Sequence, residues 1–289
     1  MDYTTTANIY SQKLEEAEFK LIQDFMLNNL GVKLSPIKIV MVNSRLIKRL
    51  KASGIHNFPD YVSFALSSEG KRSGEQQCMI DELTTHKTEF FRESDHFDIL
   101  KDMILPEFSS NKRGTFKIWS AGCSTGEEPY TMAMLMNEFK FNHNGFDYHI
   151  NASDVSTAVI DKAVKGLFKQ QTMKDVDPQI IKKYFTKIKD ERDEVFQINK
   201  TLRDRINFSR INLVDYYSFP NESFDVIFCR NTLIYFDEKS KREVVAKLIS
   251  KIKIGGYFFV GLSETVSQYS KAIKQISPSA YKKIGLTNE

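Results

Sequence analysis

The feature that most constrains the fold of this chain is a change of hydrophobic pattern near residue 115. Before it, apolar residues such as Leu14, Leu21 and Phe25 recur at the three- and four-residue spacing of helices. After it, short apolar runs alternate with amphipathic segments, which is typical of strands that alternate with helices. Strands connected in this way form a mostly parallel sheet with helices on its faces. The sequence therefore predicts a helical N-terminal part followed by an α/β domain.

The same pattern predicts three regions, because a polar stretch with Gly and Ser at residues 71–74 separates the first helices from a connecting segment. We expect a helical domain over residues 1–80, a linker over 81–115 and an α/β domain over 116–289. A stretch rich in Lys, Asp and Glu at residues 182–205 predicts a small insertion of β-hairpin type. The predicted strands are 116–121, 148–153, 206–212, 224–229, 257–261 and 280–285, and the predicted helices between them include 127–139, 156–164 and 237–252.

Composition excludes several classes of protein. The chain has 289 residues, 41% of them hydrophobic, and a net charge of +4, which excludes a mainly disordered chain and does not identify a nucleic-acid binder. The apolar run at residues 254–262 is shorter than the roughly 20 residues of a membrane helix, and no signal peptide opens the sequence, so we expect a cytoplasmic protein. Its three cysteines lack metal-ligand spacing and predict free thiols, with neither a metal site nor a disulfide framework.

A turn of small residues follows the first predicted strand. Gly122 and Gly126 flank it, and a helix begins directly after it, so backbone N–H groups can face a ligand there. A tight turn between strand and helix explains the glycines equally well. Asp154 ends the next predicted strand, where a carboxylate can accept hydrogen bonds from ribose hydroxyls, although it can also cap the following helix. Glu127 and Glu128 repel a pyrophosphate and suit a cationic ligand, so the combination favours S-adenosylmethionine.

Three segments together resemble the CheR-type protein-glutamate methyltransferases of chemoreceptors. They are TTHKTEFFR at residues 84–92, followed by His96-Phe97, then WSAGCSTGEEPY at 119–130 and FCRNTLIYF at 228–236. Ser153-Asp154, Asn212-Leu213 and Gly261-Leu262-Ser263-Glu264 occur in the order that the family has them. The resemblance covers nearly the whole chain.

This resemblance implies a class I S-adenosylmethionine-dependent methyltransferase domain, Rossmann-like with a small β insertion, behind an all-helical N-terminal domain. It implies methylation of glutamate γ-carboxylates on the cytoplasmic helices of methyl-accepting chemotaxis receptors during sensory adaptation, with S-adenosylhomocysteine as product. We expect a monomer. Tyr235 is expected near the transferred methyl group. The implied cofactor contacts are His86, Thr88, Arg92, Glu127, Asp154, Asn212, Leu213, Arg230 and Asn231.

His86 departs from the family, which commonly has Asn at this position. An imidazole can change its charge near neutral pH, so we hypothesise that cofactor affinity depends on pH. Binding measured from pH 5.5 to 8.5 in the wild type and in His86→Asn tests this, since a flat profile, or one that the substitution leaves unchanged, contradicts it.

The chemistry implied needs no general base. A glutamate, with an ordinary pKa of about 4.3, is already an anion at neutral pH and can attack the methyl group directly. Arg92 and Tyr235 are the predicted catalytic residues: Arg92 orients a carboxylate through its planar guanidinium, and Tyr235 positions the acceptor oxygen. The alternatives are a surface ion pair for Arg92 and core packing for Tyr235. DNA and RNA amino-methyltransferases commonly have an Asn/Asp-Pro-Pro-Tyr/Phe segment at this position. Residues 231–235 lack its prolines, so base methylation is disfavoured.

A basic stripe lies on the helix predicted from Pro36 to about Lys51. Lys38, Arg45 and Arg49 share one face, with Lys48 beside them. A solvated helix face is the plain interpretation. The resemblance instead implies docking on acidic receptor helices, for which reversal of Arg45 and Arg49 to Glu would raise the KM for receptor. In some members of the family that this chain resembles, a loop of the β insertion that needs glycine holds the C-terminal tether peptide of a receptor. Because no glycine occurs between Gly166 and Gly255, we expect no dependence on such a peptide here.

Two other functions remain as alternatives. One is a methyltransferase of the same fold that acts on a small molecule or on another protein, for which the basic helix would be irrelevant. The other is a regulatory module that binds cofactor or receptor without turnover, against which Arg92, Asp154, Asn231 and Tyr235 argue.

Overall fold

The computed structural model describes residues 12–111, 114–189, 194–215 and 217–286. The ends of the predicted N- and C-terminal domains, residues 112–113 of the predicted linker, residues 190–193 of the predicted insertion and residue 216 lie outside these residues. The chain divides into two compact units. The described part of the first comprises residues 12–85, 155–158 and 235–241, and the second contains the remaining described residues.

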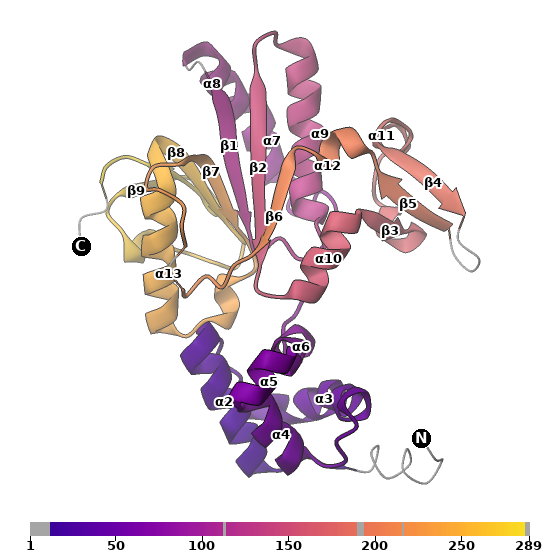
Figure 1. Cartoon of the computed structure of the whole chain (residues 1–289). Helices are drawn as coiled ribbons and strands as arrows, with labels where there is room; N and C mark the ends of the chain where they lie inside the picture. The colour runs from indigo at the N-terminus through magenta and orange to yellow at the C-terminus, as the bar shows by residue number, and fades with distance from the viewer. Residues whose placement is uncertain (1–11, 112–113, 190–193, 216, 287–289) are drawn as a thin grey trace. The chain divides into compact units, whose positions relative to one another are not determined.

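The first unit is built from helices around one apolar core (Figure 1). Its helices are α2 (Glu16–Leu30), the 3-10 turn η1 (Pro36–Lys38), α3 (Ile39–Ser53), α4 (Phe58–Leu66), α5 (Ser68–Ser73) and α6 (Glu75–Leu83). The predicted helix at Pro36 therefore begins with a 3-10 turn. Ile22 and Met26 of α2, Leu46 of α3 and Tyr61 of α4 are buried together. Ile22 and Met26 are four residues apart, and such helical spacing is why the helical prediction could be made from the sequence.

The second unit contains a seven-stranded sheet in the order β6-β2-β1-β7-β8-β10-β9. Its strands are β1 (Thr115–Ala121), β2 (Asp147–Asp154), β6 (Ile206–Arg210), β7 (Phe224–Cys229), β8 (Ile252–Val260), β9 (Ile273–Ser277) and β10 (Ala280–Lys283). The first five strands of this order pair in parallel, whereas β10 pairs antiparallel with β8 and β9. The sequence analysis missed β9, whose burial is confined largely to Ile273 and so lacks a clear apolar signal.

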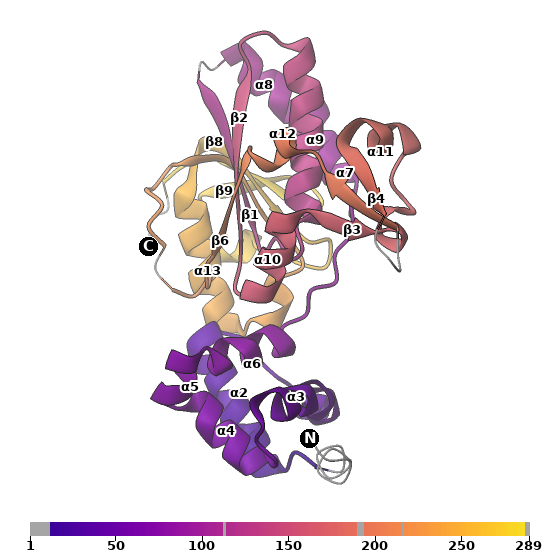
Figure 2. The ribbon, with the colours of Figure 1, turned by 45° about the vertical axis from the view of Figure 1, so that its right-hand side comes forward.

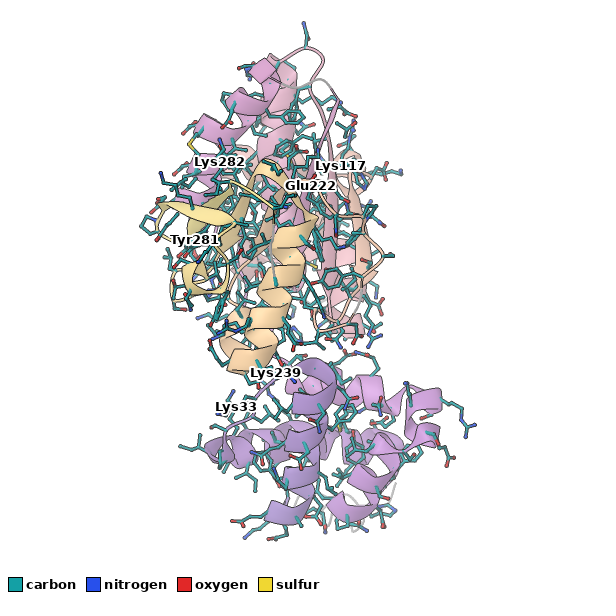
Figure 3. All side chains as sticks on the ribbon, turned by 90° about the vertical axis from the view of Figure 1, so that its left-hand side faces the viewer. Lys33, Lys117, Glu222, Lys239, Tyr281 and Lys282 are labelled. Carbon is teal, nitrogen blue, oxygen red and sulfur yellow. The ribbon has the colours of Figure 1, made fainter. Side chains whose placement is uncertain are left out.

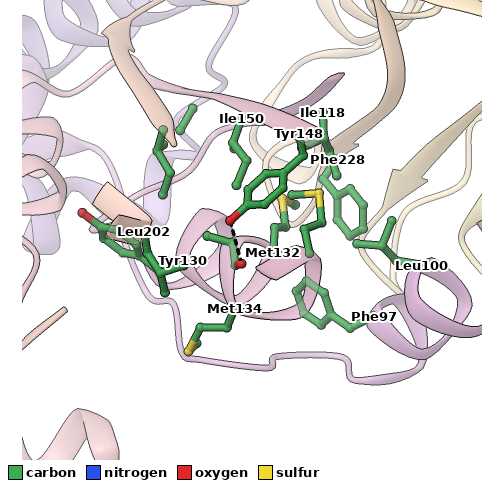
Figure 4. Close-up of a cluster of buried hydrophobic side chains, with 14 of the residues drawn as sticks. Phe97, Leu100, Ile118, Tyr130, Met132, Met134, Tyr148, Ile150, Leu202 and Phe228 are labelled. Atoms are coloured by element: carbon green, nitrogen blue, oxygen red, sulfur yellow. Dashed lines mark hydrogen bonds between the residues drawn. The ribbon is translucent and has the colours of Figure 1, made fainter. Parts of the chain in front are cut away.

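Helices cover both faces of the sheet. They are α7 (Asp95–Ile99), the π-helical turn η2 (Leu100–Ile104), α8 (Leu105–Asn111), α9 (Glu127–Asn142), α10 (Thr157–Lys165) and α13 (Glu238–Lys251). Figure 1 shows α9 and α13 on opposite sides of the sheet, and Figure 3 looks onto the α13 side. On the α9 side, Ile118 and Tyr148 pack with Met132 of α9, and the Tyr148 hydroxyl donates to the carbonyl oxygen of Ala133 (Figure 4).

The insertion is larger than the predicted hairpin. The hairpin strands β4 (Phe185–Lys189) and β5 (Glu194–Ile198) are present, but β3 (Leu167–Lys169) pairs with β5 and makes a three-stranded antiparallel sheet. The short helices η3 (Gln170–Met173), α11 (Pro178–Tyr184) and α12 (Lys200–Arg203) accompany this small sheet (Figure 2). The predicted range of 182–205 began too late, because β3 is only three residues long and pairs with a strand far along the chain.

No helix in the described part of the chain is long and apolar enough to cross a membrane.

Candidate functional site

The loop after β1 is fastened to the end of β2. The backbone amides of Gly122 and Cys123 both donate to the carbonyl oxygen of Ser153, at 2.7 and 2.9 Å. Gly122 has a φ of +92°, and a Cβ at this position would lie 2.4 Å from the Thr232 hydroxyl oxygen. Only glycine satisfies both the left-handed backbone and this close approach. The first glycine of the predicted turn is thus explained by its contact with the segment after β7.

Asp154, at the end of β2, binds the same loop. One of its carboxylate oxygens accepts a hydrogen bond from the backbone amide of Ser124 at 3.0 Å, and the side chain is nearly buried. The Ser124 hydroxyl in turn donates to the backbone carbonyl of His86 at 2.9 Å. Asp154 therefore connects the ends of β1 and β2, and Ser124 connects both to residue 86.

A carboxylate from elsewhere in the chain caps the start of α10. In the first unit, the backbone amides of Thr157 and Ala158 donate to the two carboxylate oxygens of Asp81, at 3.0 and 3.3 Å. Asp81 thus satisfies amides at the start of α10. The sequence analysis missed it, because Asp81 precedes that helix by 76 residues and no local pattern links the two.

Glu127, in the first turn of α9, is a buried acid next to the loop. Its side chain is only 4% exposed and accepts a hydrogen bond from the Thr125 hydroxyl at 2.6 Å. Burial raises the pKa of Glu127 above its ordinary value, and the Thr125 hydrogen bond opposes this shift. The acidic group lies where the helix N-terminus and the loop meet.

Arg230 lies directly after β7, and its side chain is turned into the protein. The side chain is 3% exposed, and its Nε lies 3.4 Å from a carboxylate oxygen of Glu93 and 3.4 Å from one of Glu128. Its guanidinium also donates to the backbone carbonyl of Arg92 and lies over the ring of Phe97, 5.2 Å from the ring centre. Arg230 therefore holds residues 92 and 93 against the N-terminal turn of α9.

Glu128 is the second acid of that turn. It accepts a hydrogen bond from the Ser120 hydroxyl at 2.6 Å. Burial raises the pKa of Glu128, while the charge of Arg230 lowers it. Glu128 is thus bound by Ser120 and Arg230.

The segment 86–93 has two residues in a left-handed backbone conformation, Phe91 with φ of 56° and Glu93 with φ of 54°. The amide of Phe91 donates to the hydroxyl of Thr131 in α9 at 3.2 Å. Arg92 is half-buried, and its Nη1 donates to the carbonyl oxygen of Lys87 at 2.9 Å. The Arg92 side chain thus reaches back to residue 87 of its own segment, and Thr88, also half-buried, lies between these two residues in the sequence.

Asn212 and Leu213 follow β6. The amide of Ile211 donates to the carbonyl oxygen of Asp154 at 3.0 Å, which brings the chain after β6 to the end of β2. The Asn212 side-chain oxygen accepts from the amide of Val214 at 3.4 Å, and Leu213 is buried.

Asn231 follows Arg230 and is held by two acids. Its backbone is left-handed, with φ of 55°. Its amide N–H donates to Glu264 at 2.8 Å, and its side-chain Nδ2 donates to Glu93 at 3.2 Å. The sequence analysis did not assign roles to Glu93 or Glu264, although both stand inside or beside the quoted motifs.

Most of the predicted cofactor residues therefore gather at one edge of the sheet. The carboxyl ends of parallel strands meet at this edge, which is where open α/β sheets bind ligands. The second unit brings together Glu127, Asp154, Asn212, Leu213, Arg230 and Asn231 at the ends of β1, β2, β6 and β7, with the segment containing His86, Thr88 and Arg92 bonded to the same loop and to α9.

Tyr235 lies in the other unit. Its carbonyl oxygen accepts from the amide of Lys33 at 2.9 Å, and the Lys38 ammonium lies 5.7 Å from the centre of its ring. Its predicted place near the transferred methyl group stays a prediction.

Two of the four predicted docking residues make hydrogen bonds within the helical unit. Arg49 forms a two-pronged ion pair with Glu75, at 2.9 and 2.6 Å, and the Tyr61 hydroxyl donates to the same carboxylate at 2.9 Å. Arg45 Nη1 donates to the carbonyl oxygens of Glu82 and Thr84, at 3.0 and 2.9 Å, near the C-terminus of α6.

The other two residues are arranged differently. Lys48 is exposed and Lys38 is half-buried. Within the helical unit, Arg45 and Arg49 thus bind internal acceptors and Lys38 lies over the ring of Tyr235, whereas Lys48 faces outward.

Metal ligands do not gather anywhere in the described ranges of the chain, where no group of three or more His, Cys, Asp or Glu side chains could hold an ion.

Comparison with known proteins decides the family. Residues 86–282 match the family described as "CheR methyltransferase, SAM binding domain", and residues 17–84 match "CheR methyltransferase, all-alpha domain". The chain belongs to the CheR methyltransferase family. The predicted family, fold class and cofactor are thereby confirmed.

Curated relatives of the family cover most of this chain. The chain is 37% identical to a chemotaxis protein methyltransferase of Borreliella burgdorferi, over 89% of this chain and 90% of the relative. It is 34% identical to one of Klebsiella aerogenes, over 96% and 91%, and 33% identical to one of Escherichia coli, over 89% and 87%. The family evidence supports an S-adenosylmethionine-dependent methyltransferase of chemotaxis.

The residues at the sheet edge fit this cofactor. S-adenosylmethionine carries hydroxyl and amino donors and a positive charge at its sulfonium. Carboxylate acceptors therefore suit it better than the phosphate-binding loops of dinucleotide sites would. Glu127 and Asp154 supply such acceptors beside a loop whose Gly122 lets the backbone approach closely.

Proposed function

We propose that this protein transfers the methyl group of S-adenosylmethionine to γ-carboxylates of glutamates on the cytoplasmic helices of methyl-accepting chemotaxis receptors. It would act in the cytoplasm as a monomer. The relatives' role in chemotaxis supports the proposal. The observation that carries it is the burial of three side chains that could otherwise act as base or nucleophile.

Two cysteines and one histidine of the second unit are buried away from any substrate. Cys123 and Cys229 are buried, and burial raises the pKa of each thiol well above its ordinary value. His96 is also buried, and burial lowers the pKa of its imidazole to about 4, with the nearby charge of Arg230 acting in the same direction. None of these three groups can therefore act as base or nucleophile, and a glutamate carboxylate needs neither, because it is already an anion at neutral pH.

The proposed residue roles follow from the contacts of the site. The cofactor supplies an electrophilic methyl group on a cationic sulfur. Glu127 and Asp154 would accept hydrogen bonds from its donor groups, and Arg92 would orient a carboxylate through its guanidinium. The remaining proposed contacts come from His86, Thr88, Asn212, Leu213, Arg230 and Asn231. Because its side chain is buried among Glu93, Glu128 and Phe97, Arg230 would contribute through its backbone.

Alignment is then the main task of the protein. Attack of an anion on a methyl group bound to a cation neutralises charge as the transition state forms, so no proton has to move. The residues of this site would hold the acceptor oxygen in line with the methyl group and exclude water. Tyr235 would lie beside the acceptor.

Receptor docking is proposed for the helical unit, at the face that includes Lys38, Arg45, Lys48 and Arg49. The outward part of this face is the exposed Lys48, together with Ile37, which is 87% exposed, and Val40, which is 76% exposed. A basic and apolar face suits an acidic helix, and its attraction would weaken with salt. Arg45 and Arg49 would act mainly by supporting the helix that carries this face.

The decisive experiment uses methyl-labelled S-adenosylmethionine and a cytoplasmic receptor fragment. After incubation, base treatment should release the label as volatile methanol, as carboxyl methyl esters do. Arg92→Ala should lower the rate at least tenfold, about 1.4 kcal/mol of transition-state free energy, while Arg72→Ala, on the exposed helix α5, should not. Label that is transferred but stable to base would contradict the proposal and favour a nitrogen or sulfur acceptor.

A further inference from the structure

Two carboxylates, Glu93 and Glu264, surround Asn231. Glu264 is buried, and its two oxygens accept three backbone amides: Gly261 at 2.6 Å, Asn231 at 2.8 Å and Ile234 at 3.1 Å. This one side chain therefore joins the turn after β8 to the turn after β7.

The backbone of Asn231 is held in an unfavourable, left-handed conformation. A left-handed φ of 55° costs free energy for any residue with a side chain, although Asn tolerates it better than most. A Cβ on Gly261 would lie 2.5 Å from the side-chain nitrogen of Asn231 and 2.9 Å from its backbone nitrogen. The position of Asn231 is thus determined by contacts on both sides, from Glu264 and from Gly261.

Glu93 determines which end of the Asn231 amide faces inward. Its Oε1 accepts a hydrogen bond from Nδ2 of Asn231 at 3.2 Å and a longer one from the amide of Leu262 at 3.4 Å. A carboxylate only accepts hydrogen bonds, so the NH2 end of the amide must face it. The guanidinium of Arg230 lies 3.4 Å from the other oxygen of Glu93 and balances its charge. The amide oxygen of Asn231 is the end left for a ligand.

We propose that Glu93 and Glu264 are positioning residues that hold Asn231 so that its side chain offers the cofactor a hydrogen-bond acceptor and not a donor. Asn231 would then bind an N–H or O–H group of S-adenosylmethionine. The inference rests on the proposed role of Asn231 in cofactor binding, and it specifies the chemical type of that contact.

A swap of the two side chains tests the proposal. In Asn231→Asp, two carboxylates would face each other, and affinity for S-adenosylhomocysteine, measured by calorimetry, should fall at least tenfold. Adding Glu93→Gln restores a hydrogen bond in the opposite direction, from the new amide to the new carboxylate, and leaves an acceptor oxygen at position 231 toward the ligand. The double variant should bind within about threefold of the wild type, the remaining loss reflecting the weak Leu262 contact.

The outcomes separate this inference from the proposed role of Asn231. If Asn231→Ala binds S-adenosylhomocysteine as the wild type does, the assignment of Asn231 to the cofactor fails, and the inference fails with it. If Asn231→Ala loses affinity and the double variant regains thermal stability without regaining affinity, Asn231 binds the cofactor as a donor, and the inference alone is overturned.

Glu264 is tested by Glu264→Gln, which places an NH2 group against backbone N–H donors. We expect about a tenfold loss of S-adenosylhomocysteine affinity. Glu69→Gln, on the exposed surface of α5, is the matched control and should bind as the wild type does. Unchanged binding in Glu264→Gln would overturn the positioning role of Glu264.

Discussion

At the residue scale, Arg230 shows how one buried charge organises its neighbours. It reaches the carbonyl of Arg92 and the carboxylates of Glu93 and Glu128, which come from two different segments of the chain. A buried cation between two acids contributes little net stability, but its removal leaves the acids without a counter-charge. Arg230 is therefore needed once Glu93 and Glu128 are in place.

The first prediction is that Arg230→Met lowers the free energy of unfolding by about 3 kcal/mol, because it leaves Glu93 and Glu128 buried without their cation. Urea unfolding followed by the fluorescence of Trp119, the single tryptophan and a buried residue of β1, would measure this. The triple variant that adds Glu93→Gln and Glu128→Gln should recover most of the loss. A loss that persists in the triple variant would assign the effect to packing.

The second prediction concerns His96, whose pKa burial lowers to about 4. Between its ordinary value near 6.5 and pH 4, the unfolded chain binds a proton at this imidazole that the folded protein does not. Stability contributed by the neutral form is thus present above pH 6.5 and is lost as the pH falls toward 4, by on the order of 3 kcal/mol.

Unfolding curves of the wild type and of His96→Gln over this pH range would test it. The difference in unfolding free energy between the two proteins should change with pH, whereas the exposed His56→Gln should follow the wild type. Parallel pH profiles for the wild type and His96→Gln would contradict the prediction.

At the element scale, α3 combines an inner and an outer function. Its buried face carries Val42, Leu46 and Leu50, and the flanking Arg49 binds Glu75 at the start of α6. Its outer face begins with Ile37 in the preceding turn and continues through Val40 and Lys48. Spacing along a helix shows which residues share a face, but not which cations find internal partners.

The third prediction separates these two functions. Arg49→Ala should lower the free energy of unfolding by about 2 kcal/mol, because Glu75 would lose a charged partner in a mostly buried place. Lys48→Glu should leave stability within about 0.5 kcal/mol and raise the KM for receptor severalfold, more at low salt than at high salt. Cofactor affinity should stay constant in Lys48→Glu, and an unchanged KM would refute docking through this face.

At the scale of the whole molecule, the proposed cofactor site joins the ends of β1, β2, β6 and β7 and the segment 86–93. Such a site exists only when the sheet is folded. A ligand that binds it should therefore stabilise the second unit by mass action.

The fourth prediction is that S-adenosylhomocysteine at 100 times its Kd stabilises the protein by about 2.7 kcal/mol. Thermal unfolding followed by Trp119 fluorescence should show a higher Tm with ligand than without it. In Asp154→Asn, the same ligand concentration should raise the Tm by less than half as much, because a carboxylate acceptor is lost. An equal rise in both proteins would remove Asp154 from the proposed cofactor contacts.

The sequence by itself determined that a helical part precedes an α/β domain, and it determined the family and the cofactor. These depend on local patterns: the spacing of apolar residues, a glycine turn between a strand and a helix, and short motifs that resemble one family. It could not predict β3 and β9, because short, half-exposed strands have little apolar signal of their own and depend on their partners.

The tertiary structure decided what the charged residues do. Arg49 and Glu75 are 26 residues apart, Arg45 and Glu82 are 37 apart, and Arg230 and Arg92 are 138 apart, so no pattern within a helix or a motif connects them. Whether an arginine faces solvent or a buried acid depends on which segments the fold brings together. The same reason applies to Glu93 and Glu264. Both contact Asn231 only because the fold brings the turns after β7 and β8 and the segment 86–93 together.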